Sequence, residues 1–133
     1  MKYDEFVDLV QDRAGLETER ETLIAIEATL KTLGERLTDE EAAHLAVQLP
    51  LEVGRFLTVV DTNKDFDLKT FYEQVSRRES IGQPESREHA RAVLSVVEET
   101  VTPGELRDVL AQLPDEFMTL FTFGSDWRKV EGR

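Results

Sequence analysis

A short acidic segment that follows residue 60 carries the side chains best suited to metal chemistry. Asp61, Asn63 and Asp65 stand at alternate positions, as do the first oxygen ligands of an EF-hand loop. The sixth position of such a loop requires glycine and is Phe66 here, and the twelfth requires a bidentate glutamate and is Tyr72. Because two requirements of the loop fail, the segment is predicted to be a polar linker, with calcium binding as the weaker alternative.

The two histidines are the next candidates for catalysis or metal binding. Neither His44 nor His89 has a partner at the spacing of a recognised ligand set such as HExxH. Glu40 and Glu41 precede His44, but they are better explained as the first turn of a helix. His89 is expected on a solvated side of its helix. The sequence therefore predicts structural or surface roles for both histidines.

No motif for catalysis is present in the sequence. It has no Gly-x-Ser-x-Gly elbow, no phosphate-binding loop and no Gly-x-Gly-x-x-Gly. It also has no cysteine, which excludes a disulfide scaffold, an iron–sulfur cluster and a thiolate zinc site. Acidic residues are so abundant that pairs of them say nothing about acid–base chemistry. We predict a protein that is not an enzyme, with no catalytic residues and no cofactor.

Four arginines form the densest basic cluster: Arg77, Arg78, Arg87 and Arg91. Arg77 and Arg78 fall at the expected end of a helix, where cations complement the helix dipole. Arg87 and Arg91 are four residues apart and share a helix face. Dipole compensation and ion pairing with glutamates are the favoured explanation. A site for an anion or an acidic partner is the alternative, and the four residues are candidates for partner binding.

The tail, residues 123–133, combines the only tryptophan with basic residues. Trp127 and Arg128 are residue types that anchor interfaces, which makes them further candidates for partner binding. They are equally suited to folding back over the open end of the core, and this packing is favoured.

Net charge limits the classes of partner. The 28 acidic and 16 basic residues give a formal charge of −12, which repels phosphate backbones and anionic lipid surfaces. We therefore expect no direct nucleic-acid binding and no membrane binding. No apolar run approaches the length of a membrane span, and the acidic N-terminus shows no secretory signal. A soluble, cytoplasmic protein is expected.

Apolar residues recur at helical spacing along the chain, and no segment shows sustained two-residue alternation. In the first half, this spacing predicts four helices. The first carries an apolar stripe at Tyr3, Phe6, Val7 and Val10, and the second carries one at Leu23, Ile26, Leu30, Leu33 and Leu37. The third helix runs up to Leu49, and the fourth carries Val53, Phe56 and Leu57. Gly15 is placed to end the first helix and Pro50 to separate the last two. Asp67 is placed to cap the first helix of the second half.

Two helix starts carry the pattern of a capping box. Thr38 stands three residues before Glu41, and Thr102 stands three residues before Glu105. In a capping box the threonine side chain accepts a hydrogen bond from the glutamate N–H, and the glutamate side chain accepts one from the threonine N–H. Both bonds are predicted at both helix starts.

The second half of the sequence restates the first. Residues 44–50 (HLAVQLP) are echoed 64 positions later by residues 108–114 (DVLAQLP). Leu30 aligns with Leu94 at this offset, and near the start of each half Phe6 aligns with Phe71 at an offset of 65. The predicted organisation is one domain over 1–133, with repeat one at about 2–60, a linker at 61–65, repeat two at about 66–122 and the tail at 123–133.

A half of this size is marginal alone, so the two halves are expected to share one core. Leu30 and Leu94 should occupy equivalent interior places. The predicted fold is all-α: a compact helical bundle of about eight short helices built from two pseudo-symmetric four-helix repeats.

The doubled helix that ends in Gln-Leu-Pro, together with the leucine-striped helix before it, resembles the domain of unknown function 2267 family. The resemblance covers the chain from Tyr3 to Thr122. It implies an all-α fold, and it supplies no activity, ligand or catalytic residue.

These observations favour a non-catalytic interaction or regulatory module, because stacked helical repeats present surfaces to partners. The partner is an unidentified protein, and the chain is expected to be a monomer or a weak homodimer. The alternative is a ligand- or metal-responsive binding protein that uses the groove between the repeats or the linker.

Overall fold

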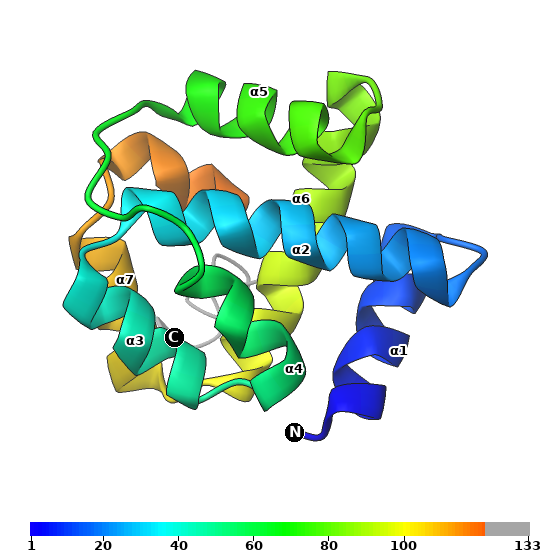
Figure 1. Cartoon of the computed structure of the whole chain (residues 1–133), viewed down its shortest axis with the longest axis horizontal. Helices are drawn as coiled ribbons and strands as arrows, with labels where there is room; N and C mark the ends of the chain where they lie inside the picture. The colour runs from blue at the N-terminus through cyan, green and yellow to red at the C-terminus, as the bar shows by residue number, and fades with distance from the viewer. Residues whose placement is uncertain (122–133) are drawn as a thin grey trace, which may run out of the picture.

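The computed structural model describes residues 1–121, and these residues fold entirely into helices, turns and loops (Figure 1). The α-helices are α1 (Tyr3–Ala14), α2 (Glu19–Arg36), α3 (Asp39–Val47), α4 (Leu51–Gly54), α5 (Leu68–Glu79), α6 (Gln83–Thr100) and α7 (Pro103–Ala111); the 3-10 helices are η1 (Arg55–Leu57) and η2 (Asp115–Leu120). Because η1 continues α4, the described residues form eight helical segments. The predicted all-α bundle is confirmed.

Short local signals set several helix ends as predicted. Gly15 ends α1 with a left-handed φ of 67°, a conformation that costs glycine little. The Asp67 side chain accepts a hydrogen bond from the Thr70 N–H and caps α5. Ser80 ends α5 with a φ of 60°, so the chain turns sharply into α6. This turn brings the last turn of α5 close to the first turns of α6.

Only half of each predicted capping box forms at α3 and α7. Thr38 accepts from the Glu41 N–H, and Thr102 accepts from the Glu105 N–H, both at 3.1 Å. The second bond of the prediction is wrong, because neither glutamate accepts the threonine N–H. Both glutamates are buried instead.

At each helix start, a glutamine from the other half of the sequence accepts the threonine N–H instead. The Thr38 N–H donates to Gln112 Oε1 at 3.1 Å, and the Thr102 N–H donates to Gln48 Oε1 at 2.9 Å. Gln112 is the C-cap of α7 and Gln48 is the C-cap of α3. Each of the two Gln-Leu-Pro motifs therefore caps the start of the helix that carries the other one.

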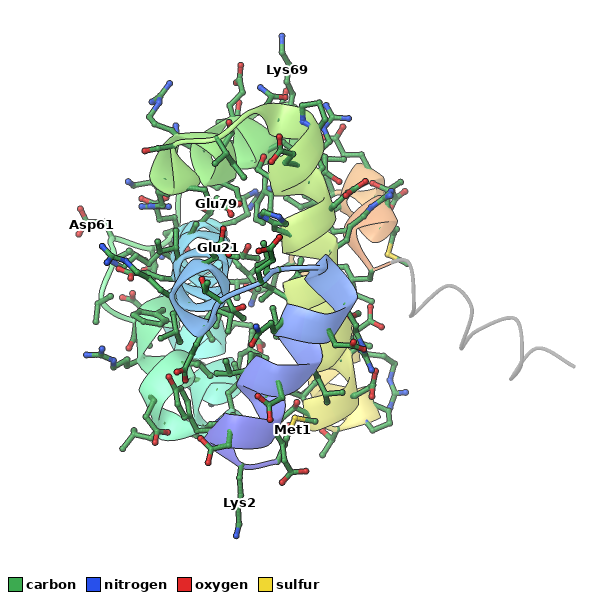
Figure 2. All side chains as sticks on the ribbon, turned by 90° about the vertical axis from the view of Figure 1, so that its right-hand side faces the viewer. Met1, Lys2, Glu21, Asp61, Lys69 and Glu79 are labelled. Atoms are coloured by element: carbon green, nitrogen blue, oxygen red, sulfur yellow. The ribbon has the colours of Figure 1, made fainter. Side chains whose placement is uncertain are left out.

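Two ion pairs also join the first half of the chain to the second, one in each direction. Arg13, in the last turn of α1, lies 2.5 Å from Glu99 of α6. Arg78, in the last turn of α5, lies 3.0 Å from Glu35 of α2. Figure 1 shows α5 running along α2, and Figure 2 shows α1 lying against α6. The first helix of each half thus packs against the long helix of the other half.

Side chains from both halves fill one core. Phe6, Leu30, Phe71, Leu94 and Phe117 are all completely buried in the same cluster. The expected interior placement of Leu30 and Leu94 is confirmed. None of the helices in residues 1–121 is long and apolar enough to cross a bilayer.

Two glycines allow backbones to approach closely. A Cβ added to Gly34 in α2 would lie 2.2 Å from the Leu57 carbonyl oxygen, and one added to Gly54 in α4 would lie 2.4 Å from that of Ala46. Both distances are far below van der Waals contact, and backbone atoms cannot move aside without displacing their helices.

We predict that Gly34→Ala destabilises the protein by about 2–4 kcal/mol, because the new methyl group must push η1 away from α2. Gly104→Ala is the matched control: its Cβ meets nothing closer than 3.9 Å, and alanine in a helix is favoured over glycine by up to about 1 kcal/mol. Urea unfolding of both variants measures the difference. Equal stability of Gly34→Ala and the wild type would contradict the packing of α2 on η1.

Candidate functional site

The glutamates left free by the exchanged caps meet between α3 and α7. Glu41 and Glu105 are each only 7 % exposed, and their carboxyl groups hydrogen-bond to each other. Burial raises the pKa of Glu41 to about 8, and the hydrogen bond and charge of Glu105 add to the effect, followed by the charges of Asp108 and Glu40. The two carboxyl groups therefore share a proton at neutral pH, and the pair joins the two helices.

A second buried carboxyl group lies where α5 turns into α6. The side chain of Glu79 is only 3 % exposed, and its Oε2 is hydrogen-bonded to Nδ1 of His89 at 2.7 Å. The other oxygen, Oε1, is buried and accepts no hydrogen bond from any residue between 1 and 121. Burial raises the pKa of Glu79; His89 opposes this shift and the charge of Glu85 adds to it.

The expected placement of His89 is wrong. Its side chain is 12 % exposed and packs beside Glu79, rather than projecting from a solvated side of α6. His44, in contrast, is exposed on α3, as a surface role predicts.

Glu79 and His89 line a cavity of about 440 Å³. Its apolar wall includes Leu16 and Ile24, and Glu21 lies on the α2 side. Figure 2 shows Glu79 below α5, close to Glu21 at the near end of α2. The volume lies within the range of small-molecule sites, about 300–1,000 Å³. We call this space the Glu79 cavity.

Glu79 and Ile24 also line a second cavity, of about 420 Å³. Lys31 and Arg78 contribute to its wall. Lys31 is paired with Glu27 at 2.6 Å, and Arg78 is paired with Glu35. Both basic groups of this second cavity are therefore paired with glutamates, whereas Glu79 retains an oxygen without a partner among residues 1–121.

The sequence contains an indication that Glu79 and His89 are buried, which the motifs considered above did not include. Glu79 follows the buried residues Phe71 and Val75 at steps of four, so it continues their stripe on α5. His89 precedes the buried Val93 by four residues in the same way. A charged residue on an apolar stripe indicates a buried polar contact, and both residues show it.

The linker candidates for calcium are held by the end of α2. The N–H of Asn63 donates to the Leu37 carbonyl at 2.8 Å, and Asp65 pairs with Arg36 at 3.3 Å. Asp61 is exposed. Over residues 1–121, no three histidine or acidic side chains are grouped closely enough to hold a metal ion.

The four clustered arginines have different surroundings. Arg78 turns toward α2 and pairs with Glu35, and the guanidinium of Arg87 lies 4.6 Å from the centre of the Tyr72 ring. Arg77 and Arg91 are exposed. The other two partner-binding candidates, Trp127 and Arg128, lie outside the residues that the structure describes.

A single core shared by crossed helices, with caps exchanged between α3 and α7, defines an all-helical bundle protein. The family described as "Uncharacterized conserved protein (DUF2267)" matches residues 3–120, and the chain belongs to this family. No curated protein matches the chain.

The Glu41–Glu105 pair predicts a dependence of stability on pH. Because the folded state keeps a proton that the unfolded chain releases, stability should fall as the pH rises from about 4.5 to about 8. Glu41→Gln removes one ionisable group from the pair and keeps its shape. We expect its stability at pH 8 to exceed that of the wild type by about 2 kcal/mol, and the two proteins to converge near pH 4.5.

Urea unfolding at several pH values tests this expectation. Glu40→Gln, a change of the neighbouring exposed residue, is the control for net charge and should retain the wild-type slope. If Glu41→Gln shows the same loss of stability with pH as the wild type, the shared proton is not at this pair.

Proposed function

We propose that this chain is a non-catalytic binding protein that takes up a small ligand in the Glu79 cavity. The observation that carries the proposal is the buried Oε1 of Glu79, which accepts no hydrogen bond within residues 1–121. Buried polar atoms without partners are rare in proteins, and each one calls for an explanation. A ligand that donates a hydrogen bond here would supply the missing partner.

Binding is favoured over catalysis by the composition of the cavity wall. Glu79 and His89 point their polar atoms at each other, and no serine or threonine hydroxyl belongs to the described residues that line this cavity. Hydroxyl-based covalent catalysis needs a serine or threonine beside its base, and the described residues of this wall offer neither. The wall combines convergent polar groups with the apolar side chains of Leu16, Ile24 and Ile81, and both kinds of group are found in ligand sites.

The position of the cavity suits a regulatory role. Its wall is formed by the turn between α1 and α2, by α2 itself, and by the ends of α5 and α6 that meet at Ser80. A ligand in this place contacts both halves of the chain. Since it binds only the folded state, it stabilises the contact between them.

We further infer that the two halves are pseudo-symmetric tandem repeats. Corresponding helices have equal lengths: 12 residues in α1 and α5, 18 in α2 and α6, and 9 in α3 and α7. The exchanged glutamine caps and the crossed arginine pairs support the same conclusion. The Glu79 cavity departs from the symmetry, because the positions equivalent to Glu79 and His89 in the first half are Ala14 and Ala25.

One observation favours a protein-interaction module as a second candidate function. Val47 at the end of α3 and Leu51 at the start of α4 are 81 % and 82 % exposed. Exposed apolar side chains that gather on a surface mark interaction sites. These two residues lie on either side of Pro50, on α3 and α4, whereas Arg77, Arg78, Arg87 and Arg91 lie on α5 and α6.

The expected weak homodimer is tested at these two residues. We predict that the wild type sediments faster at higher concentration, and that Val47→Ser/Leu51→Ser abolishes this dependence because the apolar contact is lost. Sedimentation velocity over a range of concentrations measures it. A wild type that stays monomeric throughout, or a double variant that still associates, excludes self-association through this surface.

For the Glu79 cavity, we predict that a screen of amines, acids, sugars and nucleotides finds a class that raises the melting temperature of the wild type, as ligand linkage requires. The same compounds should shift the imidazole NMR signal of His89 and leave that of the exposed His44 unchanged. Glu79→Gln should lose the effect. Asp61→Asn, which makes the same change in charge at the far edge of the molecule (Figure 2), should retain it. A screen in which no compound moves the His89 signal contradicts the proposal.

A further inference from the structure

We propose that the ligand of the Glu79 cavity is an organic cation: a primary ammonium group carried on an apolar chain. This inference rests on the proposed function and specifies the chemical class of its ligand.

The charge of the cavity wall is the first reason. Four carboxyl groups line it, from Glu21, Glu79, Glu85 and Glu88, and no lysine or arginine belongs to the described residues of this wall. A recess lined by one sign of charge concentrates ions of the opposite sign. The second cavity is lined by Lys31 and Arg78 as well as by glutamates, so it lacks this bias.

The orphaned oxygen of Glu79 is the second reason. An ammonium group brings three N–H donors and no acceptor, so it suits an acceptor that lacks a partner. A charge-assisted hydrogen bond is about twice as strong as a neutral one. The Glu79 side chain lines the cavity, and its Oε1 is the oxygen that lacks a partner within residues 1–121.

The burial of Glu79 is the third reason to expect a cationic ligand. It raises the pKa of this carboxyl group because the ionised form has lost its water. A cation beside Oε1 restores a favourable environment for the ionised form. Glu79 would therefore contribute more to binding a cation than an equally placed exposed glutamate would.

The apolar part of the wall indicates what the cation is attached to. Leu16, Ile24 and Ile81 line the same cavity as the carboxyl groups, and Ile24 is among the few large apolar residues exposed within residues 1–121. An alkyl chain laid on these side chains removes apolar surface from water. A bare metal ion would leave this surface exposed, and the described residues provide no group of three ligands for one.

The test uses hexylammonium as the probe and follows the imidazole signals of the whole chain by NMR at physiological ionic strength. We expect hexylammonium to shift the His89 signal with an affinity about tenfold or more above that of the neutral analogue 1-hexanol, because only the ammonium makes charge-assisted bonds. Hexanoate, the anionic analogue, should leave the signal unchanged. His44 reports non-specific binding to the acidic surface.

Variants assign the effect to residues. Glu79→Gln should weaken hexylammonium binding about tenfold or more, and Asp61→Asn should leave it unchanged. Since a buried substitution risks the fold, Glu85→Gln/Glu88→Gln provides a second variant at exposed positions on the cavity wall. It should weaken binding severalfold while the protein remains folded.

The outcomes separate this inference from the proposed function. If 1-hexanol or hexanoate shifts His89 as strongly as hexylammonium does, the cavity binds ligands and the cation inference is wrong. The same holds if hexylammonium leaves His89 unmoved while another class in the screen shifts it. If no compound of any class shifts the His89 signal, both the cation inference and the proposed function are wrong. Equal shifts of His44 and His89 by hexylammonium show general attraction to an acidic protein and also overturn the inference.

Discussion

The exchange of hydrogen bonds between α3 and α7 is the constraint on which the rest of the architecture depends. A helix start must satisfy its free N–H groups, and here the glutamines at the two helix ends satisfy the N–H groups of Thr38 and Thr102 across the molecule. The two glutamates that would have done this locally are released. They become the buried Glu41–Glu105 pair, whose shared proton ties the same two helices together.

The same crossing arrangement produces the Glu79 cavity. Because α5 packs on α2 rather than only on its own half, its last turn reaches the turn between α1 and α2. Arg78 forms its ion pair with α2, and the next residue, Glu79, is buried between α2 and α6. The ligand site we propose is thus a consequence of how the halves interlock, and it would be absent from either half alone.

Local patterns predicted the helices and the core well, because the spacing of apolar residues records which face is buried. They predicted Gly15, Asp67 and the threonine caps for the same reason, since each acts within one turn. The partners of Thr38 and Glu41 could not be predicted in this way, because they lie more than sixty residues away. Glu79 and His89 were accessible in principle from their place on apolar stripes, but the sequence alone does not show the space beside them.

The difference between the halves is informative about Glu79. A buried acceptor without a partner costs on the order of 1–3 kcal/mol, and a burden of this size is a large part of the stability of a small domain. In the repeat alignment that we infer, Ala14 corresponds to Glu79 and Ala25 corresponds to His89. Ala25 is fully buried and brings no polar group into the interior. The fold therefore accommodates alanine in this role and does not require a carboxyl group. The carboxyl group in the second half is better explained by something that binds to it than by the packing of the helices around it.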